Sequence, residues 1–311
     1  KHARILLNRR NYAEVKQLLC SKSFDINRTG GLAGTAILHI AAQFDDIETL
    51  KFISKLTNID LNVVNIDKKV TPLQCAVHEG NIQSLKFLIE KGANLNAKNI
   101  NGFTALMFAV QYNSIECVEE LLNHKNCDLN IENIDGNNAL MVGIKNIDMV
   151  KRLIDKTDLS HENNYGFSAL SYACVNGCLD VVQLILSRSA IDLNKPDKFG
   201  MTLMQLALSR CDVDMMYFLY QHGATMPEEL SFSADGEIFI RDNSSLIQQQ
   251  ITYDPSTQQQ TITNYQQNSY YPSNYPQNSH YPLNYSQNSF HPSNYPQNAY
   301  YPSNYQQNTQ Y

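Results

Sequence analysis

A three-residue phrase recurs six times in this chain at nearly constant spacing. Each copy has an acidic or amide residue, then Leu or Ile, then Asn or Ser, and the copies begin at positions 25, 60, 94, 128, 158 and 192. The steps between them are 35, 34, 34, 30 and 34 residues. A fixed period of this length is typical of one supersecondary unit stacked on copies of itself. The spacing therefore predicts a solenoid.

Between the phrases, apolar residues follow the spacing i, i+3, i+6 and i+7, which places them on one face of a short helix. These stripes begin at Tyr12, Ile47, Ile82, Ile115, Ile147, Leu179 and Val213. A second short helix, containing small residues such as Ala76 and Ala109, precedes each stripe. One helix pair is too small to bury its own apolar face and needs its neighbours to cover it. We predict an all-α array of about seven helix pairs in residues 1–226.

Residues at the predicted helix ends agree with this reading. Thr71 is a good N-cap, and Pro72 fits the first helical position, where its missing N–H costs nothing. Gly92 is expected in the left-handed conformation just after a helix. Four further glycines stand in turns shortly before helix starts, at Gly102, Gly136, Gly166 and Gly200. We expect these turns to need dihedral angles that glycine adopts easily.

Residues 70–76, 78–81 and 90–97 together resemble one nearly complete ankyrin repeat, which opens with Val-Thr-Pro-Leu-Gln-Cys-Ala. Residues 101–106 and 165–170 are similar to the same opening in later copies. The resemblance covers the whole predicted array, and it implies the fold of that family, an ankyrin-repeat solenoid. The array is divergent and is also similar to those of effectors that intracellular bacteria deliver into eukaryotic cytosol.

The histidine of the family's Thr-Pro-Leu-His signature is retained only as His39. The other copies replace it with Gln74, Met107, Met141, Ser171 and Gln205. The resemblance implies that this loss weakens the hydrogen bonds between neighbouring turns. We expect repeats of uneven stability within an unchanged fold.

The charge distribution argues against two classes of partner. The net charge is −6, and no long basic stripe is present, so nucleic acid is not predicted as the main ligand. No stretch approaches the ~18 uninterrupted apolar residues of a membrane span, and no secretory signal is visible. We predict a protein partner, a repeat domain that is monomeric, and a cytoplasmic location, which is host cytosol if the protein is secreted.

Cysteine and histidine patterns do not indicate catalysis. The seven cysteines are odd in number and form no C-x-x-C pair, which favours neither a disulfide framework nor a zinc knuckle. His78-Glu79 and His161-Glu162 do not extend to H-E-x-x-H, and no nucleophile-elbow, P-loop or kinase signature is present. We predict a non-enzymatic protein without a cofactor or metal, although a catalytic domain preceding Lys1 stays an open alternative.

The resemblance implies that partners bind the turn tips and the first helices. The positions carried over are Phe44, His78, Glu79, Ile100, Phe103, Gln111, Tyr112, Tyr165, Phe167, Phe199, Met201 and Arg210. Aromatic and Met side chains within a polar rim are typical of protein-binding hot spots, so we predict an exposed cluster here. The alternative is that the phenylalanines pack against adjacent turns and stiffen the loops.

The residue pattern of the chain changes after Met226. Residues 227–254 are predicted to form a capping turn or a short hairpin around Asp235-Gly236. Residues 255–311 carry no charge and repeat a ten-residue unit that starts at 267, 277, 287 and 297. With frequent Pro and few aliphatic residues, this tail is predicted to be disordered.

Two functions remain open from the sequence. The first is an adaptor that holds a partner in the concave face of the ankyrin-like array. The alternative is an assembly protein that associates through its tail, because eleven of the eighteen tyrosines lie from Tyr265 onward. Duplication without any selected role also explains the tail.

Overall fold

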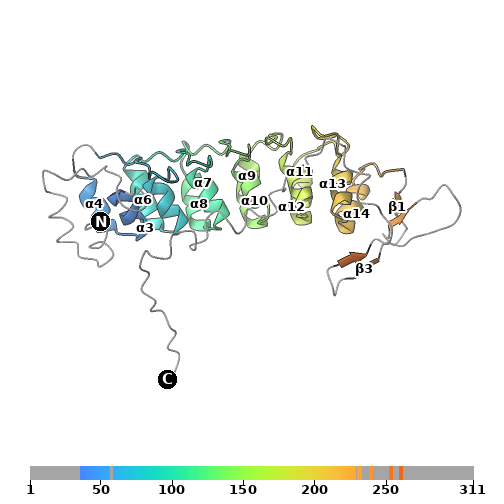
Figure 1. Ribbon diagram of the computed structural model, residues 1–311, viewed down its shortest axis with the longest axis horizontal. Helices are drawn as coiled ribbons and strands as arrows, with labels where there is room; N and C mark the ends of the chain where they lie inside the picture. Colours follow the sequence, from blue (N-terminus) through green and yellow to red (C-terminus); the bar gives the residue numbers. More distant parts are fainter. Residues whose placement is uncertain are drawn as a thin grey trace, which may run out of the picture. The chain divides into compact units, whose positions relative to one another are not determined.

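The computed structural model describes residues 36–56, 59–228, 230–232, 238–240, 252–254 and 259–261. Contacts divide the chain into units 1–270 and 271–311, and every described residue belongs to the first unit. The described part contains six helix pairs in succession (Figure 1). The first helices are α3 (Ile37–Gln43), α5 (Pro72–His78), α7 (Ala105–Gln111), α9 (Ala139–Val142), α11 (Ala169–Val175) and α13 (Leu203–Ser209). The second helices are α4 (Ile47–Ile53), α6 (Ile82–Glu90), α8 (Ile115–Leu122), α10 (Ile147–Leu153), α12 (Leu179–Arg188) and α14 (Val213–Gln221).

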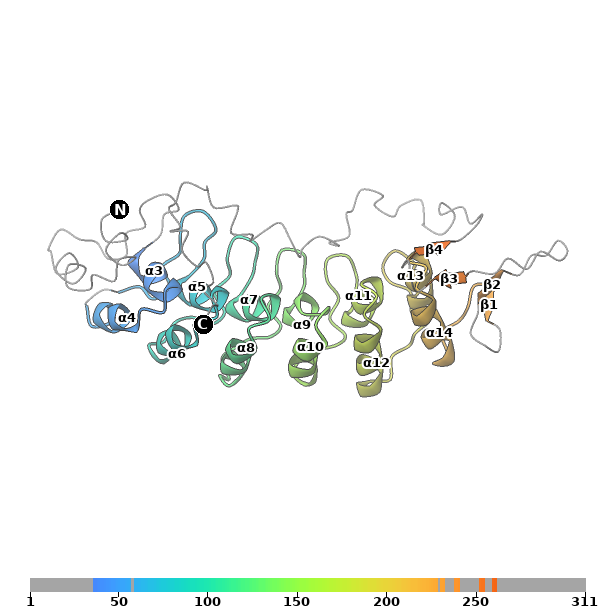
Figure 2. The ribbon, with the colours of Figure 1, turned by 90° about the horizontal axis from the view of Figure 1, so that it is seen from below.

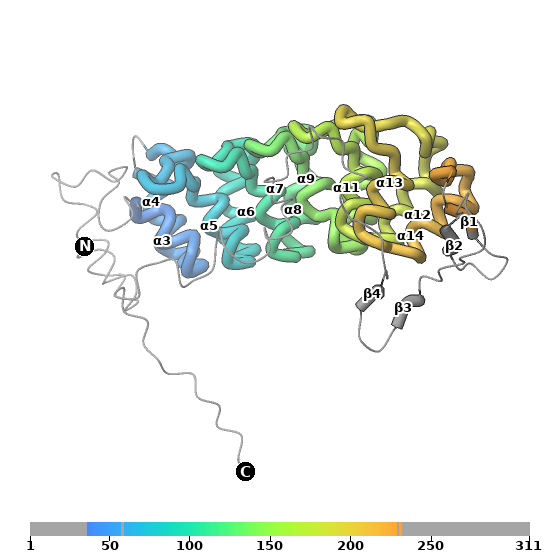
Figure 3. Tube along the Cα trace, turned by 45° about the vertical axis from the view of Figure 1, so that its right-hand side comes forward, coloured from blue at the N-terminus to red at the C-terminus, as the bar shows by residue number. Residues whose placement is uncertain are grey.

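The helix pairs stack in chain order. Each first helix from α3 to α11 packs against the first helix of the next pair, and α13 ends the series. Figure 2 shows the connecting loops on one side of the first helices and the second helices on the other side. The tube in Figure 3 follows the same order from pair to pair. The predicted ankyrin-repeat solenoid is confirmed.

Every described second helix begins at the residue where the sequence places the start of its apolar stripe. The third and sixth residues after that start are buried in all six helices. They are Leu50 and Ile53, Leu85 and Leu88, Val118 and Leu121, Val150 and Leu153, Val182 and Ile185, and Met216 and Leu219. Small residues such as Ala76 and Ala109 are buried on the first helices, where they allow the close approach that was predicted. The pair predicted around Tyr12 lies outside the described residues.

Helix caps explain why the first helices start where they do. The Thr71 hydroxyl accepts a hydrogen bond from the Gln74 N–H, and the Gln74 side-chain oxygen accepts one from the Thr71 N–H, at 3.3 and 3.0 Å. This capping box satisfies two donors that the helix itself leaves unpaired. Gly92 follows α6 with φ of +87°, as the sequence predicts.

The fourth described pair is shortened at the turn between its helices. Helix α9 has four residues, whereas the other described first helices have seven. Gly143 follows it, and a Cβ atom at Gly143 would lie 2.4 Å from Cγ1 of Val110 in α7. Glycine at this position therefore permits a close approach that the shorter connection requires.

Two short hairpins follow the array. Strand β1 (Leu230–Phe232) pairs antiparallel with β2 (Ile238–Ile240), within the segment for which a capping turn or a short hairpin is predicted. Strand β3 (Thr252–Asp254) pairs antiparallel with β4 (Gln259–Thr261). The segment predicted to be disordered thus contains strand residues at 259–261, and the remainder of that segment lies outside the described residues.

Candidate functional site

In each described loop, those that lead into α5, α7, α9, α11 and α13, one buried or partly buried polar side chain closes the loop. In the loop before α7, Oδ1 of Asn99 accepts hydrogen bonds from the N–H groups of Asn101 and Phe103, at 2.9 and 2.8 Å. The Asn99 N–H donates to the Phe103 carbonyl at 3.0 Å, and Gly102 between them has φ of +76°. The same pattern recurs in later loops at Asn133, Asn163 and Asp197. One side chain thus satisfies two backbone N–H groups in each of these loops, which favours a single loop conformation.

The loop before α5 is closed in the same way by Asn65, but it is one residue longer than the other loops. Oδ1 of Asn65 accepts from the N–H groups of Lys68 and Val70, at 3.3 and 2.8 Å. This loop has no glycine, and Lys69 takes the left-handed conformation with φ of +52°. A non-glycine residue in that conformation carries strain.

Backbone hydrogen bonds join the tips of neighbouring loops. The Ile100 N–H donates to the Lys68 carbonyl at 2.9 Å, and the Ile134 N–H donates to the Asn101 carbonyl at 3.1 Å. The Asn164 N–H donates to the Asp135 carbonyl at 3.0 Å. These hydrogen bonds hold the tips of the four loops at fixed positions relative to one another.

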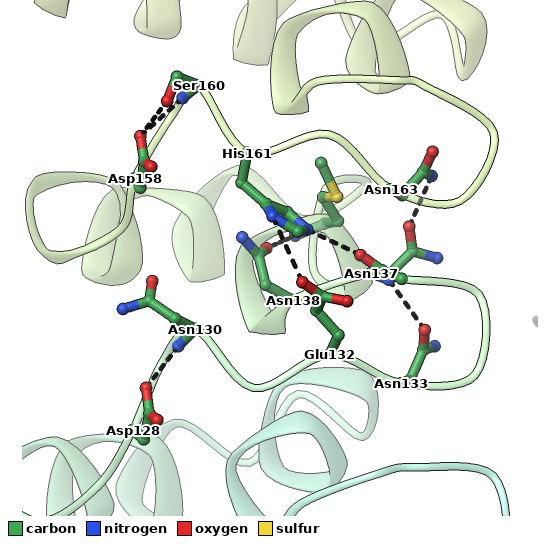
Figure 4. Close-up of polar contacts among 12 residues, drawn as sticks. Asp128, Asn130, Glu132, Asn133, Asn137, Asn138, Asp158, Ser160, His161 and Asn163 are labelled. Carbon is green, nitrogen blue, oxygen red and sulfur yellow. Dashed lines mark hydrogen bonds and ion pairs between the residues drawn. The ribbon is translucent and has the colours of Figure 1, made fainter.

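Side chains add further links between loops around the shortened pair, as Figure 4 shows. Nε2 of His161 lies 2.8 Å from the Gly136 carbonyl, and its Nδ1 lies 3.7 Å from a carboxylate oxygen of Glu132. The Asn163 side-chain amide donates to Oδ1 of Asn137 at 2.8 Å. These contacts connect two loops that are 30 residues apart in the sequence, whereas neighbouring loops elsewhere are 34 residues apart.

The recurring phrase that reveals the period also has a structural role. Its first residue closes a local turn, as where Oδ1 of Asp128 accepts the Asn130 N–H at 2.9 Å. Its third residue reaches the next copy, as where Oδ1 of Asn96 accepts the Asp128 N–H at 3.0 Å. No such bond joins Asn130 to Asp158 in the part of the chain that the structure describes. Among the described residues, no bond of this kind joins Ser160 to Asp192 either, and one returns where Oδ1 of Asn194 accepts the Thr225 N–H at 2.7 Å.

The predicted exposure of three candidate residues is wrong. Phe103, Phe167 and Met201 are buried, and Phe167 is only 2% exposed. Each is the last loop residue before the helix N-cap, where the closed loop turns its side chain inward. The rings of Phe103 and Phe108 lie 5.7 Å apart, within the stack. The structure agrees instead with the alternative prediction for the two phenylalanines, that they pack against adjacent turns.

The other candidate residues reach the surface to different degrees. Those exposed are Phe44, Glu79, Ile100 and Arg210, and those partly buried are His78, Gln111, Tyr112, Tyr165 and Phe199. Phe44 is 57% exposed at the end of α3. Lys198 places its ammonium group 5.5 Å from the centre of the Phe199 ring.

Four residues lie at the ends of α3, α5 and α7, and we call Phe44, His78, Glu79 and Tyr112 the first-helix patch. The rings of His78 and Tyr112 meet edge to face at 4.6 Å. A carboxylate oxygen of Glu79 lies 3.2 Å from His78 Nδ1 and accepts a hydrogen bond from the Gln43 side chain at 3.2 Å. The hydrogen bond from His78 holds the pKa of Glu79 below its usual value. Phe44 follows Gln43 directly in the chain, and its ring is exposed.

A second apolar feature lies on the loop tips. Ile66, Ile100 and Ile134 each follow the buried asparagine of their loop and are 66%, 55% and 58% exposed. We call them the isoleucine row. The candidate residues predicted from the sequence include Ile100 but not Ile66. The signal was available, because the three stand 34 residues apart.

The described residues offer no arrangement suited to metal or thiol chemistry. No group of three or more His, Cys, Asp or Glu side chains among them could hold a metal ion. Burial raises the pKa of Cys174 to about 12 and that of Cys117 to about 11, which disfavours the reactive thiolate. Among these same residues, no helix has the length and apolar character needed to cross a bilayer.

Comparison with protein families decides the classification. A model described as ankyrin repeats (3 copies) matches residues 5–99, 38–133, 106–197 and 145–229. The chain belongs to the ankyrin-repeat family. Ankyrin repeats are protein–protein interaction modules, and members of the family are typically non-enzymatic.

Similar proteins come from distant organisms. The human transient receptor potential cation channel subfamily A member 1 is 29% identical over 207 residues, which are 65% of this chain and 16% of the channel. A putative ankyrin repeat protein of Rickettsia felis is 27% identical over 157 residues, covering 49% of this chain and 41% of that protein. The crystal structure of the ankyrin repeat domain of Bcl-3, a member of the IkappaB protein family, matches with a TM-score of 0.57 and 27% identity. That match covers 62% of this chain and 88% of the Bcl-3 chain. The ankyrin array thus spans less than half the length of these two curated relatives.

Proposed function

We propose that this ankyrin-repeat protein is a non-enzymatic adaptor that holds a partner protein on its loops and first helices. The observation that carries the proposal is the combination of exposed apolar side chains with rigid loops. Phe44 and the isoleucine row are exposed, and the backbone beneath the row is fixed by hydrogen bonds within and between loops. Apolar side chains on a rigid scaffold lose little entropy on binding, which favours affinity.

The second helices are a weaker candidate for the binding surface. Their exposed and partly buried charges form ion pairs between neighbouring helix pairs, between Lys86 and Glu120 at 3.7 Å and between Arg152 and Glu119 at 3.2 Å. A further pair joins Arg188 to Asp155 at 3.4 Å. Mixed and paired charges of this kind are typical of a solvated face.

The proposal is tested by capture from eukaryotic cytosol with the full chain and a double variant, Phe44→Asn with Tyr112→Asn. Asparagine is suitable because Asn176 occupies the corresponding position after α11. Lys86→Asn, on the second helix α6, serves as the matched control. We expect a partner that the native chain and the control hold and the double variant loses by ~10-fold or more. Equal capture by all three proteins would count against the first-helix patch.

We further propose that the chain acts as a monomer in the cytosol of a eukaryotic host. The proposal is supported by a composition rich in Asn, Ile and Gln, which resembles that of an AT-rich coding source, and by the similar protein of Rickettsia felis. A tagged chain expressed in its native source would be found in host cytosol by cell fractionation. Tagged protein that stays with the source cells would contradict this location.

A second candidate function rests on the tyrosine-rich tail. Its decapeptide repetition offers many weak, equivalent contacts, which favours self-association. Turbidity of residues 255–311 at rising concentration distinguishes the two proposals. The adaptor requires no self-association, whereas assembly predicts turbidity that falls when the tail tyrosines are replaced by serine.

A further inference from the structure

The isoleucine row has a regular spacing set by the fold. Ile66, Ile100 and Ile134 occupy equivalent places in three loops whose tips are joined by backbone hydrogen bonds of 2.9 and 3.1 Å. Packed helices stand about 8–10 Å apart, so successive isoleucines repeat at about that distance. The next two loops carry Asn164 and Lys198 at the same place, and the row therefore ends at Ile134.

We propose that the isoleucine row is a docking site for an amphipathic helix of the partner, and this rests on the proposed adaptor function. A helix advances about 10.5 Å in seven residues, so one apolar residue per heptad would meet each isoleucine in turn. A β-strand presents the same face every ~6.7 Å and falls out of register with the row. The tip N–H groups of Ile100 and Ile134 are also already bonded to neighbouring loops.

A polyproline II segment has a suitable repeat, of about 9.3 Å, but the surface lacks what such segments require. They are recognised by grooves lined with aromatic side chains. The exposed positions of this row are aliphatic. Aliphatic side chains interdigitate well with the Leu, Ile and Val positions of an amphipathic helix.

The charges beside the row define the direction of the helix. Lys69 and Lys98 are exposed beside Ile66 and Ile100. Glu132 occupies before Ile134 the place that Lys98 occupies before Ile100, and Asp135 follows Ile134 as Asp67 follows Ile66. Glu162 lies in the following loop, paired with Lys195 at 3.5 Å. The two lysines at the Ile66 end outnumber Asp67, whereas Glu132 and Asp135 at the Ile134 end are both acidic. The Glu132 carboxylate has His161 Nδ1 at 3.7 Å but is still about half exposed. A helix is negative at its carboxyl end and positive at its amino end. The complementary partner therefore directs its carboxyl end, with acidic side chains, toward Ile66 and its amino end toward Ile134.

A displayed library of helical peptides, with randomised positions on an Ala/Glu/Lys frame, tests the proposal against the full chain. The decisive variant is the triple replacement Ile66→Asn, Ile100→Asn and Ile134→Asn. Asparagine is compatible with the fold because Asn164 stands at the same place in the next loop. Tyr220→Gln, which changes an exposed apolar residue on α14, is the control. Circular dichroism of each variant establishes that it is folded.

We expect selected peptides to lose ~10-fold or more of their affinity on the triple variant and to keep it on the control. Their sequences should carry apolar residues every seventh position, with acidic residues near the carboxyl end. Binders that are insensitive to the triple variant, binders without this spacing, or no binders at all would overturn the proposal. If the captured partner still depends on Phe44 and Tyr112, only the helix proposal falls and the adaptor function stands.

Discussion

The side chain of Gln74 in α5 donates hydrogen bonds to the carbonyl of Phe103, in the next loop, at 2.9 Å and to that of Ala97 at 2.7 Å. His39 makes the equivalent bond one unit earlier, because its Nε2 lies 2.8 Å from the Val70 carbonyl. The expectation that losing the histidine weakens contacts between turns is therefore wrong at Gln74. An amide NH₂ group carries two donors and replaces the imidazole N–H.

Replacing Gln74 with alanine should lower the free energy of unfolding by about 1–3 kcal/mol, since two carbonyls lose their donor. Gln74→His should retain most of the stability. The matched control is Gln205→Ala, because Gln205 closes the same capping box, and its described hydrogen bonds stay within its own helix start. Urea denaturation of the three variants measures the difference. Equal losses for Gln74→Ala and Gln205→Ala would show that only the cap matters.

His39 should make stability depend on pH. Burial lowers its pKa from the ordinary 6.5, and Nδ1 accepts the Ala36 N–H, so the neutral ring is the form that fits. The unfolded chain then binds the proton more readily, and stability that is present above pH 6.5 is lost as the pH falls below it.

The variant His39→Gln should remove this loss, with a difference from the native chain of up to about 1.4 kcal/mol per pH unit below 6.5. Urea denaturation at pH 7 and pH 5 provides the measurement. His124→Gln, at a partly exposed site after α8, is the matched control for replacing a histidine by glutamine. If the stability of His39→Gln and that of the native protein fall equally between pH 7 and pH 5, His39 is not the cause of the pH dependence.

Asp197 stands where the other loops carry asparagine, and its Oδ2 is buried without a partner. Burial raises the pKa of Asp197, while the N–H groups of Met201 and Phe199 oppose the shift. Asp197→Asn should stabilise the protein by on the order of 1 kcal/mol at pH 7, because the two N–H bonds to Oδ1 remain and the charge is removed.

The advantage of Asp197→Asn should shrink as the pH falls. A raised pKa means that the folded native chain takes up a proton before the unfolded chain does, so its stability recovers as the pH falls through the raised value toward 3.8. Urea denaturation at pH 7 and pH 4 measures the effect. Asp192→Asn, whose side chain closes an exposed turn, should change stability by less than ~0.5 kcal/mol. An Asp197→Asn protein less stable than the native one at pH 7 would refute the prediction.

Two glycines at equivalent loop positions separate backbone strain from steric clash. Gly102 and Gly200 have φ of +76° and +81°, but a Cβ at Gly102 would lie 2.8 Å from the Asn133 backbone, whereas Gly200 has nothing within 4 Å. Gly200→Ala should cost about 1 kcal/mol from strain alone. Gly102→Ala should cost clearly more, as thermal denaturation would show. Equal losses of stability in Gly102→Ala and Gly200→Ala would mean that the loop carrying Asn133 moves aside at no cost in free energy.

Most of the array follows from the sequence because its signals are local. The starts of the second helices, the buried third and sixth stripe residues and the left-handed Gly92 depend on short-range spacing and dihedral preference. The direction in which a loop side chain points does not follow from such local signals. Phe103 and Ile100 lie in the same loop, yet one is buried and the other exposed.

That difference arises from the Asn99 side chain, which folds the loop so that Phe103 turns inward ahead of the helix. Tertiary contacts of this kind do not appear in hydrophobic periodicity. The compensation by Gln74 was missed for a related reason, since its acceptors lie 23 and 29 residues away in sequence. The period places residues along the stack, and the contacts between loops decide which of them a partner can reach.

Hydroxyl-radical footprinting of the full chain, alone and with its captured partner, tests the central claim most directly. The account predicts that Phe44, Tyr112 and Ile100 become protected when the partner binds, while Tyr220 on α14 keeps its reactivity. Protection of Tyr220 with unchanged reactivity at Phe44, Tyr112 and Ile100 would place the partner on the second helices and contradict the account.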